Sequence, residues 1–210
     1  MKKLFLGLVT IASFAGANAQ KTTFGIQGGV QSTTIALRLE EDDEKVAVET
    51  PGVGFTIGGV ADIAVSDHFS VQPNLLFSYK GGKTLFPGQG KLSAMSIDLP
   101  INALYRHNGF FIGAGPNFSY GVSGKIKPFE DDADDLDFYD KEDGEDAPIK
   151  RFEIGVNGVM GYQFASGFGL SVNYTRGLNN LVNDDDADDD IKWNFKRIGL
   201  NFTYMFGKNK

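Results

Sequence analysis

Apolar and polar residues alternate with a period of two along most of the chain from Thr22 onward. In the last such segment, residues 197–206, the even positions are Ile, Leu, Phe, Tyr and Phe and the odd ones are mostly polar. Successive side chains of a β-strand point to opposite faces, so this period predicts strands with one apolar and one polar face. Eight strands are expected, at approximately 22–32, 53–65, 69–80, 93–106, 110–122, 151–164, 168–177 and 197–206.

The gaps between these strands alternate between long and short. Short turns are expected at 66–68, 106–109 and 165–167, and long gaps at 33–52, 81–91, 123–150 and 178–192. This interleaving predicts an all-β fold, an eight-stranded, antiparallel, up-and-down transmembrane β-barrel of the outer-membrane type. Both termini are then expected in the periplasm and the long loops outside the cell. The rival is a soluble calycin-like barrel with reversed alternation, which the Gly-rich polar faces disfavour as a core.

The N-terminus predicts export. Lys2 and Lys3 precede an apolar run at 4–14, and Ala17-Asn18-Ala19 forms an A-x-A cleavage site, as in a secretory signal peptide. The expected organisation is a signal peptide at 1–19 and one barrel domain at 20–210. The sequence has no cysteine, which removes disulfides and thiolate metal ligands.

The chain is acidic, and its acidic residues are concentrated in three short windows. The formal net charge is −7, and 22 of the 27 acidic residues lie in the windows 40–44, 130–146 and 184–190, all within long gaps. An acidic chain is not expected to bind nucleic acid. Clustered carboxylates could form a Ca²⁺ site, but the spacing in these windows fits no EF-hand, so solvated loops are favoured. We therefore expect no metal and no cofactor.

Aromatic residues and prolines add detail to the expected strands. Six tyrosines share the apolar face near strand ends, which predicts an outer girdle of Tyr79, Tyr120 and Tyr174 and an inner one of Tyr105, Tyr162 and Tyr204. Prolines at 73, 100 and 116 lie inside strands. Because proline has no N–H to donate, bulges or locally broken pairing are expected there.

Charged residues on the polar faces are candidates for a network in the lumen: Asp62, Lys80, Asp98, Glu153 and Arg197. We expect Glu153, Arg197 and Lys80 to form a charge layer, with Asp98 deeper and available to the remaining cation. An eight-stranded barrel is just wide enough for side chains to fill, so this network predicts a plugged lumen rather than a channel. Catalysis is not expected: the two histidines, His68 and His107, fall in short turns without an evident titrating partner.

Several segments resemble the PorT-like outer-membrane β-barrels of Bacteroidota over nearly the whole mature chain. They are 25–30 in the first strand, Ile97-Asp98-Leu99-Pro100, Gly113-Ala114-Gly115-Pro116, and 174–180 at the exit of the seventh strand. The last strand, with Arg197, Gly199, Phe202 and Tyr204, resembles the insertion signal read by the barrel assembly machinery. The resemblance implies the barrel fold and a place in the outer membrane. It implies little about activity, and the secretion role that gave the family its name is not carried over.

The sequence therefore predicts a non-enzymatic outer-membrane barrel, monomeric, with a structural or interaction role. Its expected partners are outer-membrane lipid, lipopolysaccharide, the barrel assembly machinery and an unidentified protein. The alternative is a transport or secretion-accessory component, acting as a narrow pore or as part of a larger machine. Conductance in planar bilayers separates the two hypotheses.

Overall fold

The computed structural model describes residues 21–41, 44–83, 91–127, 136–137, 139, 147, 149–182 and 191–207. The expected signal peptide and most of the three acidic windows lie outside these residues. The described strands are β1 (Thr22–Glu41), β2 (Glu44–Ala64), β3 (Phe69–Lys83), β4 (Lys91–His107), β5 (Phe110–Lys127), β6 (Leu136–Asp137), β7 (Phe152–Gln163), β8 (Phe168–Gly177) and β9 (Ile191–Met205). No helix within this part of the chain is long and apolar enough to cross a membrane.

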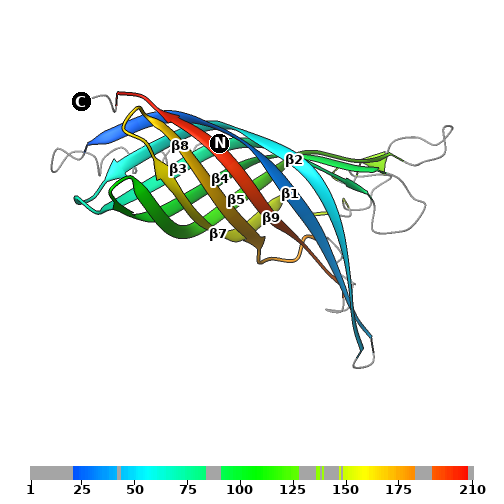
Figure 1. Cartoon of the computed structure of the whole chain (residues 1–210). Helices are drawn as coiled ribbons and strands as arrows, with labels where there is room; N and C mark the ends of the chain where they lie inside the picture. The colour runs from blue at the N-terminus through cyan, green and yellow to red at the C-terminus, as the bar shows by residue number, and fades with distance from the viewer. Residues whose placement is uncertain are drawn as a thin grey trace, which may run out of the picture.

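Eight of these strands close into an antiparallel barrel (Figure 1). Neighbours in sequence pair with one another, β9 pairs with β1, and β4 pairs with β5 to complete the ring. The two-residue β6 pairs with β5 at the end of the barrel that carries the long gaps. The prediction of an all-β, eight-stranded antiparallel barrel is confirmed.

The alternation also behaves as expected. On β9, Leu200 and Phe202 are 40% and 64% exposed, whereas Arg197 and Asn201 are buried in the lumen at 3% and 4%. Aromatic rings gather outside the barrel near the short turns, where Tyr204 contacts Phe168 and Phe206 at centroid distances of 4.8 and 5.6 Å. Such a belt is typical of the level where a bilayer meets water.

The strands extend farther than the sequence pattern predicted at the end with the long gaps. β1 and β2 stay paired from Thr22↔Ile63 to Glu41↔Glu44, and their hairpin projects well beyond the barrel wall (Figure 1). β9 begins at Ile191 rather than at Arg197. The boundaries were wrong because they were set where the lipid-facing alternation fades, whereas the backbone ladder continues into the loop region.

One of the three turns is tighter than expected, because β4 ends at His107 and β5 begins at Phe110. Between β4 and β5 only Asn108 and Gly109 leave the strands, with φ of 49° and 86°, as a two-residue type I′ hairpin turn requires. Arg106 and His107, which were expected in this turn, belong to β4. Between β7 and β8, Gly167 supplies the positive φ, 90°.

The prolines interrupt pairing as predicted, and they do so without shifting the register. Two rungs are missing beside each of Pro73, Pro100 and Pro116, and the ladder resumes in the same register on the far side. The bulge between β4 and β5 lies elsewhere, at Met95 and Ser96. Locally broken pairing is therefore what these prolines cause.

Candidate functional site in the barrel lumen

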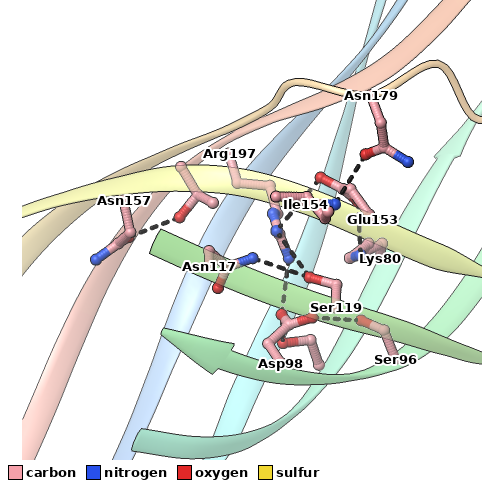
Figure 2. A network of polar contacts seen from close by, with 12 residues as sticks. Lys80, Ser96, Asp98, Asn117, Ser119, Glu153, Ile154, Asn157, Asn179 and Arg197 are labelled. Atoms are coloured by element: carbon pink, nitrogen blue, oxygen red, sulfur yellow. Dashed lines mark hydrogen bonds and ion pairs between the residues drawn. The ribbon is translucent and has the colours of Figure 1, made fainter. Parts of the chain in front are cut away.

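The lumen holds a layer of four ionisable side chains contributed by four strands: Lys80 on β3, Asp98 on β4, Glu153 on β7 and Arg197 on β9 (Figure 2). Each is at most 4% exposed. The alternation on each strand turns them inward. We call these four residues the charge layer, and the structure brings together the four residues that the sequence singled out.

The tightest contact in the charge layer joins Arg197 to Asp98. Arg197 Nη1 donates to Asp98 Oδ2 at 2.7 Å. Asp98 also accepts hydrogen bonds from Ser78 Oγ at 2.6 Å and from Ser96 Oγ at 2.9 Å. Three donors therefore replace water around this carboxylate, as a buried charge requires.

Glu153 is held more loosely. Its Oε1 lies 3.7 Å from Arg197 Nη2, and its Oε2 lies 4.0 Å from Lys80 Nζ. Both contacts are ion pairs, and both distances are too long for a hydrogen bond. The expected order of partners is thus reversed: Asp98, and not Glu153, is the main partner of Arg197. The reason is that Ser78, Ser96 and Ser119 orient the Asp98–Arg197 pair, and Arg197 Nη2 also donates to Ser119 Oγ at 3.3 Å.

An apolar cap covers the charge layer on the side of the long gaps. It consists of six buried residues, namely Leu92, Ala94, Tyr139, Ile149, Leu181 and Phe195. Lys80 Nζ lies 4.9 Å from the centre of the Phe195 ring, which is a cation–π contact between the two layers. The sequence pattern does not predict this cap, because three of its members, Tyr139, Ile149 and Leu181, lie in long gaps that have no periodic alternation.

Arg151 fastens the cap to the barrel wall. Its Nη2 donates to the Tyr139 carbonyl oxygen at 2.9 Å, its Nη1 approaches the Gly121 carbonyl oxygen at 3.3 Å, and its guanidinium lies over the Tyr139 ring. Burial in the cap raises the pKa of the Tyr139 phenol to about 12, and the negative charge of Glu153 adds to the effect. Tyr139 therefore stays neutral under ordinary conditions.

Amides fill the lumen on the other side of the charge layer. Asn157 Nδ2 donates to Asn102 Oδ1 at 2.9 Å, and Asn157 Oδ1 accepts from Thr175 Oγ1 at 2.7 Å. Asn201 Nδ2 donates to Asn173 Oδ1 at 2.8 Å. A cavity of about 40 Å³ remains among these side chains, which is room for a few water molecules.

A second ion pair lies nearer the short turns. Arg106 Nη2 lies 3.1 Å from Asp62 Oδ1, and Arg106 Nε donates to Ser70 Oγ at 2.9 Å. The sequence pattern predicts Asp62 in the lumen, whereas it predicts Arg106 at the turn after β4. Continuing the inward alternation of Asn102 and Leu104 by two residues would have found it.

The two histidines lie beside each other, contrary to expectation. The rings of His68 and His107 stack at a centroid distance of 6.1 Å, and His68 also stacks on Tyr105. His68 lies in the turn before β3 and His107 is the last residue of β4, and the β3–β4 pairing of Phe69 with Tyr105 brings the two together. The only hydrogen bond of either ring within the described part of the chain joins His107 Nε2 to Asn108. Among the described residues, no group of three metal-ligating side chains is found.

The segment that follows β8 has a structural role that the sequence did not reveal. Asn179 Oδ1 accepts from the Ile154 backbone N–H at 2.8 Å, and its Nδ2 donates to the Phe152 carbonyl oxygen at 2.9 Å (Figure 2). Asn179 thus supplies ladder partners to β7 beyond the last rung of its pairing with β8, Gly155↔Gly177. This contact holds Glu153, which lies between the two bonded residues, in place.

Comparisons with known proteins concern the barrel as a whole. Among solved structures, the chain is similar to Neisserial surface protein A, with 11% identity and a TM-score of 0.52 over 89% of this chain and 100% of that one. It is also similar to Ail of Yersinia pestis, crystallised with the heparin analogue sucrose octasulfate, with 12% identity and a TM-score of 0.43 over 88% and 99% of the two chains. OprG of Pseudomonas aeruginosa has 15% identity and a TM-score of 0.41 over 89% and 97%.

No curated protein sequence matches the chain. The family described as outer membrane protein beta-barrel domain matches residues 18–183, which is most of the chain and includes seven of the eight barrel strands. The similarity to Neisserial surface protein A supports the same fold. The closed barrel, its apolar outer wall and its polar lumen are what such a protein requires. The chain is an outer-membrane β-barrel protein and belongs to the outer membrane protein beta-barrel domain family.

Proposed function

We propose that this barrel is a membrane-anchored scaffold with a filled, non-catalytic lumen, which holds acidic loops at the cell surface for a structural or interaction role. The observation that carries the proposal is the neutral lumen. Among the described residues, three cations (Lys80, Arg106 and Arg197) face three anions (Asp62, Asp98 and Glu153) inside the barrel. Such a set leaves no excess charge to draw a solute inward.

The proposed topology puts both termini in the periplasm and the acidic windows outside. The three short turns lie at the end of the barrel where β9 finishes, and the projecting β1–β2 hairpin lies at the other (Figure 1). Short periplasmic turns and longer extracellular loops are the rule for such barrels. A protease added to intact cells should cut within 130–146. Cleavage only after permeabilisation of the outer membrane would show the reverse topology.

The proposed partners follow from this topology. They are outer-membrane lipid with lipopolysaccharide, the barrel assembly machinery during insertion, and a surface protein that the acidic loops engage, with the barrel itself a monomer and no role for nucleic acid. Arg197, Gly199, Phe202 and Tyr204 are proposed to form the assembly signal. In support, Phe202 is exposed on the outer side of β9 and Tyr204 contacts Phe168 and Phe206 there, whereas Gly199 points inward, where an added Cβ would clash with Asn173 Oδ1.

Crosslinking in native membranes tests the interaction role. Three of the acidic residues, Asp184, Asp185 and Asp186, would be replaced by Asn, and three neutral changes in the Ser66–His68 turn would serve as the control. We expect a surface protein to be captured by the wild type and by the turn variant but not by the loop variant. Equal capture by all three would contradict a role for the acidic loops.

We also infer that the chain belongs to the PorT-like group. The segment 174–180, which carries part of that resemblance, contains the Asn179 bonds to β7, so the motif has a structural reason to persist with this fold.

The alternative function, a narrow pore or secretion accessory, is favoured by one observation, the amide-lined cavity beneath the charge layer. Steady ion conductance of the wild type would favour it.

A further inference from the structure

The β1–β2 hairpin extends beyond the strands that flank it. β2 is paired with β1 from Glu44 onward, whereas its ladder with β3 begins only at Gly54. Within the described residues, no strand pairs with Glu44–Thr50 on the side away from β1. In Figure 1 this part of β2 forms one margin of the projecting hairpin. We call Glu44–Thr50 the β2 margin, and an edge of this kind is a template for pairing with another strand.

The projecting part of the sheet has one apolar and one charged face. The register with β1 and β9 places several apolar residues on the face that carries Phe195, namely Leu37, Leu39, Val46, Val48 and Trp193. The other face carries Arg38, Glu40, Lys45 and Glu49 by the same register. A strand added at the β2 margin should therefore alternate in the same way, with apolar residues on one face and charged residues on the other.

The β2 margin is complementary to itself. Its sequence is Glu-Lys-Val-Ala-Val-Glu-Thr, with Ala47 at the centre. If two copies pair antiparallel with Ala47 facing Ala47, Lys45 of each copy stands opposite Glu49 of the other, and Val46 stands opposite Val48. Opposite charges and β-branched residues that face each other directly stabilise an antiparallel pair. Both copies gain the same contacts, because the pair has two-fold symmetry.

The sequence favours this register over its neighbours. Pairs centred on Val46 or Val48 would place no opposite charges across the edge. Pro51 follows the β2 margin directly, and because proline has no N–H to donate, it limits the pairing on that side. A lone lysine commonly protects an edge strand from pairing, whereas here Glu49 of the second copy supplies a counter-charge for Lys45.

We propose that two copies of this protein associate through their β2 margins, as an antiparallel, two-fold symmetric strand pair centred on Ala47. The three-stranded extensions formed by β9, β1 and β2 then join into one sheet of six strands. A two-fold contact uses the same patch on both copies, so this contact joins two copies only. It lies beyond the barrel wall, and each barrel remains a separate ring of eight strands. The proposal goes beyond the proposed function and does not depend on which end of the barrel faces outside.

Sedimentation equilibrium of the refolded full chain in detergent tests the pairing, because detergent lets the two barrels adopt whichever relative orientation the strands require. We expect a dimer that dissociates on dilution. Lys45→Glu or Glu49→Lys alone places like charges opposite each other at two positions, and should raise the dissociation constant about tenfold, at up to ~1 kcal/mol for each pair. An equimolar mixture of the two single variants should regain the dimer, because every lysine then faces a glutamate. Asp67→Lys, at an exposed position in the β2–β3 turn, is the control and should change the constant less than twofold.

Cysteine crosslinking tests the register, and the chain has no cysteine of its own. Residues directly opposite in an antiparallel pair have Cα atoms about 4.5–5.5 Å apart, which a disulfide can span. Ala47→Cys should therefore give a disulfide-linked dimer under mild oxidation. Ala36→Cys, one strand inward on β1 and on the same face, should crosslink at least tenfold less.

Four results would each overturn the pairing. They are a wild type that stays monomeric, a loss of the dimer in Asp67→Lys equal to that in Glu49→Lys, no recovery in the mixture, and equal crosslinking of the two cysteine variants. Far-UV circular dichroism of each variant shows whether the barrel has folded. None of these measurements involves the acidic residues of 184–190 or ion conductance, so failure of the pairing and failure of the proposed function are recognised separately.

Discussion

The two faces of the same eight strands make different demands on the sequence. On the outer face of β9, Ile198, Leu200 and Phe202 are each exposed, and any apolar side chain of similar size would serve. On the inner face, Arg197 and Asn201 contact partners from four other strands, including Asp98, Glu153 and Asn173. Each outer residue contributes to stability independently, whereas the inner residues depend on one another. Substitutions on the two faces should therefore differ both in the size of their effect on the free energy of unfolding and in whether those effects add.

The largest effect is expected for Arg197→Met. This change leaves Asp98 and Glu153 buried with only Lys80 to oppose them, and breaking a buried pair by removing one partner costs ~3–5 kcal/mol. Urea titration of the protein refolded into lipid vesicles measures the loss in the free energy of unfolding.

The matched double change Arg197→Met, Asp98→Asn separates coupling from simple loss. It removes the tightest pair together, so it should destabilise less than Arg197→Met alone. The pair Arg197→Met, Glu153→Gln should recover less, because Glu153 lies 3.7 Å from Arg197 whereas Asp98 lies 2.7 Å from it. Strictly additive losses in both double variants would contradict the coupling.

Leu200→Arg should show the next largest effect, because it breaks the outer face. Leu200 lies mid-strand on the lipid side, and an arginine near the bilayer midplane costs ~2–4 kcal/mol. The same change at Leu178, just beyond β8, should cost under about 1 kcal/mol. Unfolding titrations in lipid provide both values, and equal tolerance at the two positions would show that Leu200 does not face hydrocarbon.

Burial of Tyr139 in the apolar cap should make the free energy of unfolding fall at high pH. An unfolded tyrosine ionises near pH 10, whereas burial raises the pKa of Tyr139 to about 12. A raised pKa means that the stabilisation is intact below pH 10 and is lost as the pH rises toward 12, by at most about 2–3 kcal/mol at ~1.4 kcal/mol per unit. Tyr139→Phe is the control and should lose less stability over this interval. Identical pH profiles would contradict burial of the phenol.

The smallest effect is expected at a turn. Gly109 has a φ of 86°, and an added Cβ would lie 2.8 Å from the Gln163 carbonyl oxygen, so Gly109→Ala should cost about 1–2 kcal/mol. Gly207 has a φ of 74° but open space around it. Gly207→Ala should therefore cost less, and thermal unfolding can rank the two. The reverse order would show that steric contact is not what constrains the β4–β5 turn.

The sequence predicted the barrel because lipid imposes a simple rule on the outer face. Strand number, pairing order and the inward side of Asp98 or Arg197 all follow from a period of two. The partners within the lumen do not follow from it, because they depend on which strands lie opposite each other and on small donors such as Ser78 and Ser96. This is why Asp98 was ranked below Glu153 as the partner of Arg197.

Contacts formed outside the membrane were the hardest to predict. Tyr139 and Leu181 lie in the cap without belonging to a strand, so no periodic signal marks them. Asn179 bonds to the backbone of β7 from 25 and 27 residues away, and only the folded topology brings it there. His68 and His107 likewise meet because the β2–β3 turn lies beside the end of β4.

Conductance in planar bilayers tests the central claim, that a neutral charge layer beneath an apolar cap closes the lumen. The account predicts no steady ion conductance for the wild type and measurable conductance once both barriers are weakened, as in Arg197→Met combined with Phe195→Ala. Phe195 packs in the cap and contacts Lys80. The matched outer-face variant Leu200→Ala should stay closed. Steady conductance of the wild type would contradict the filled lumen and would favour a narrow pore.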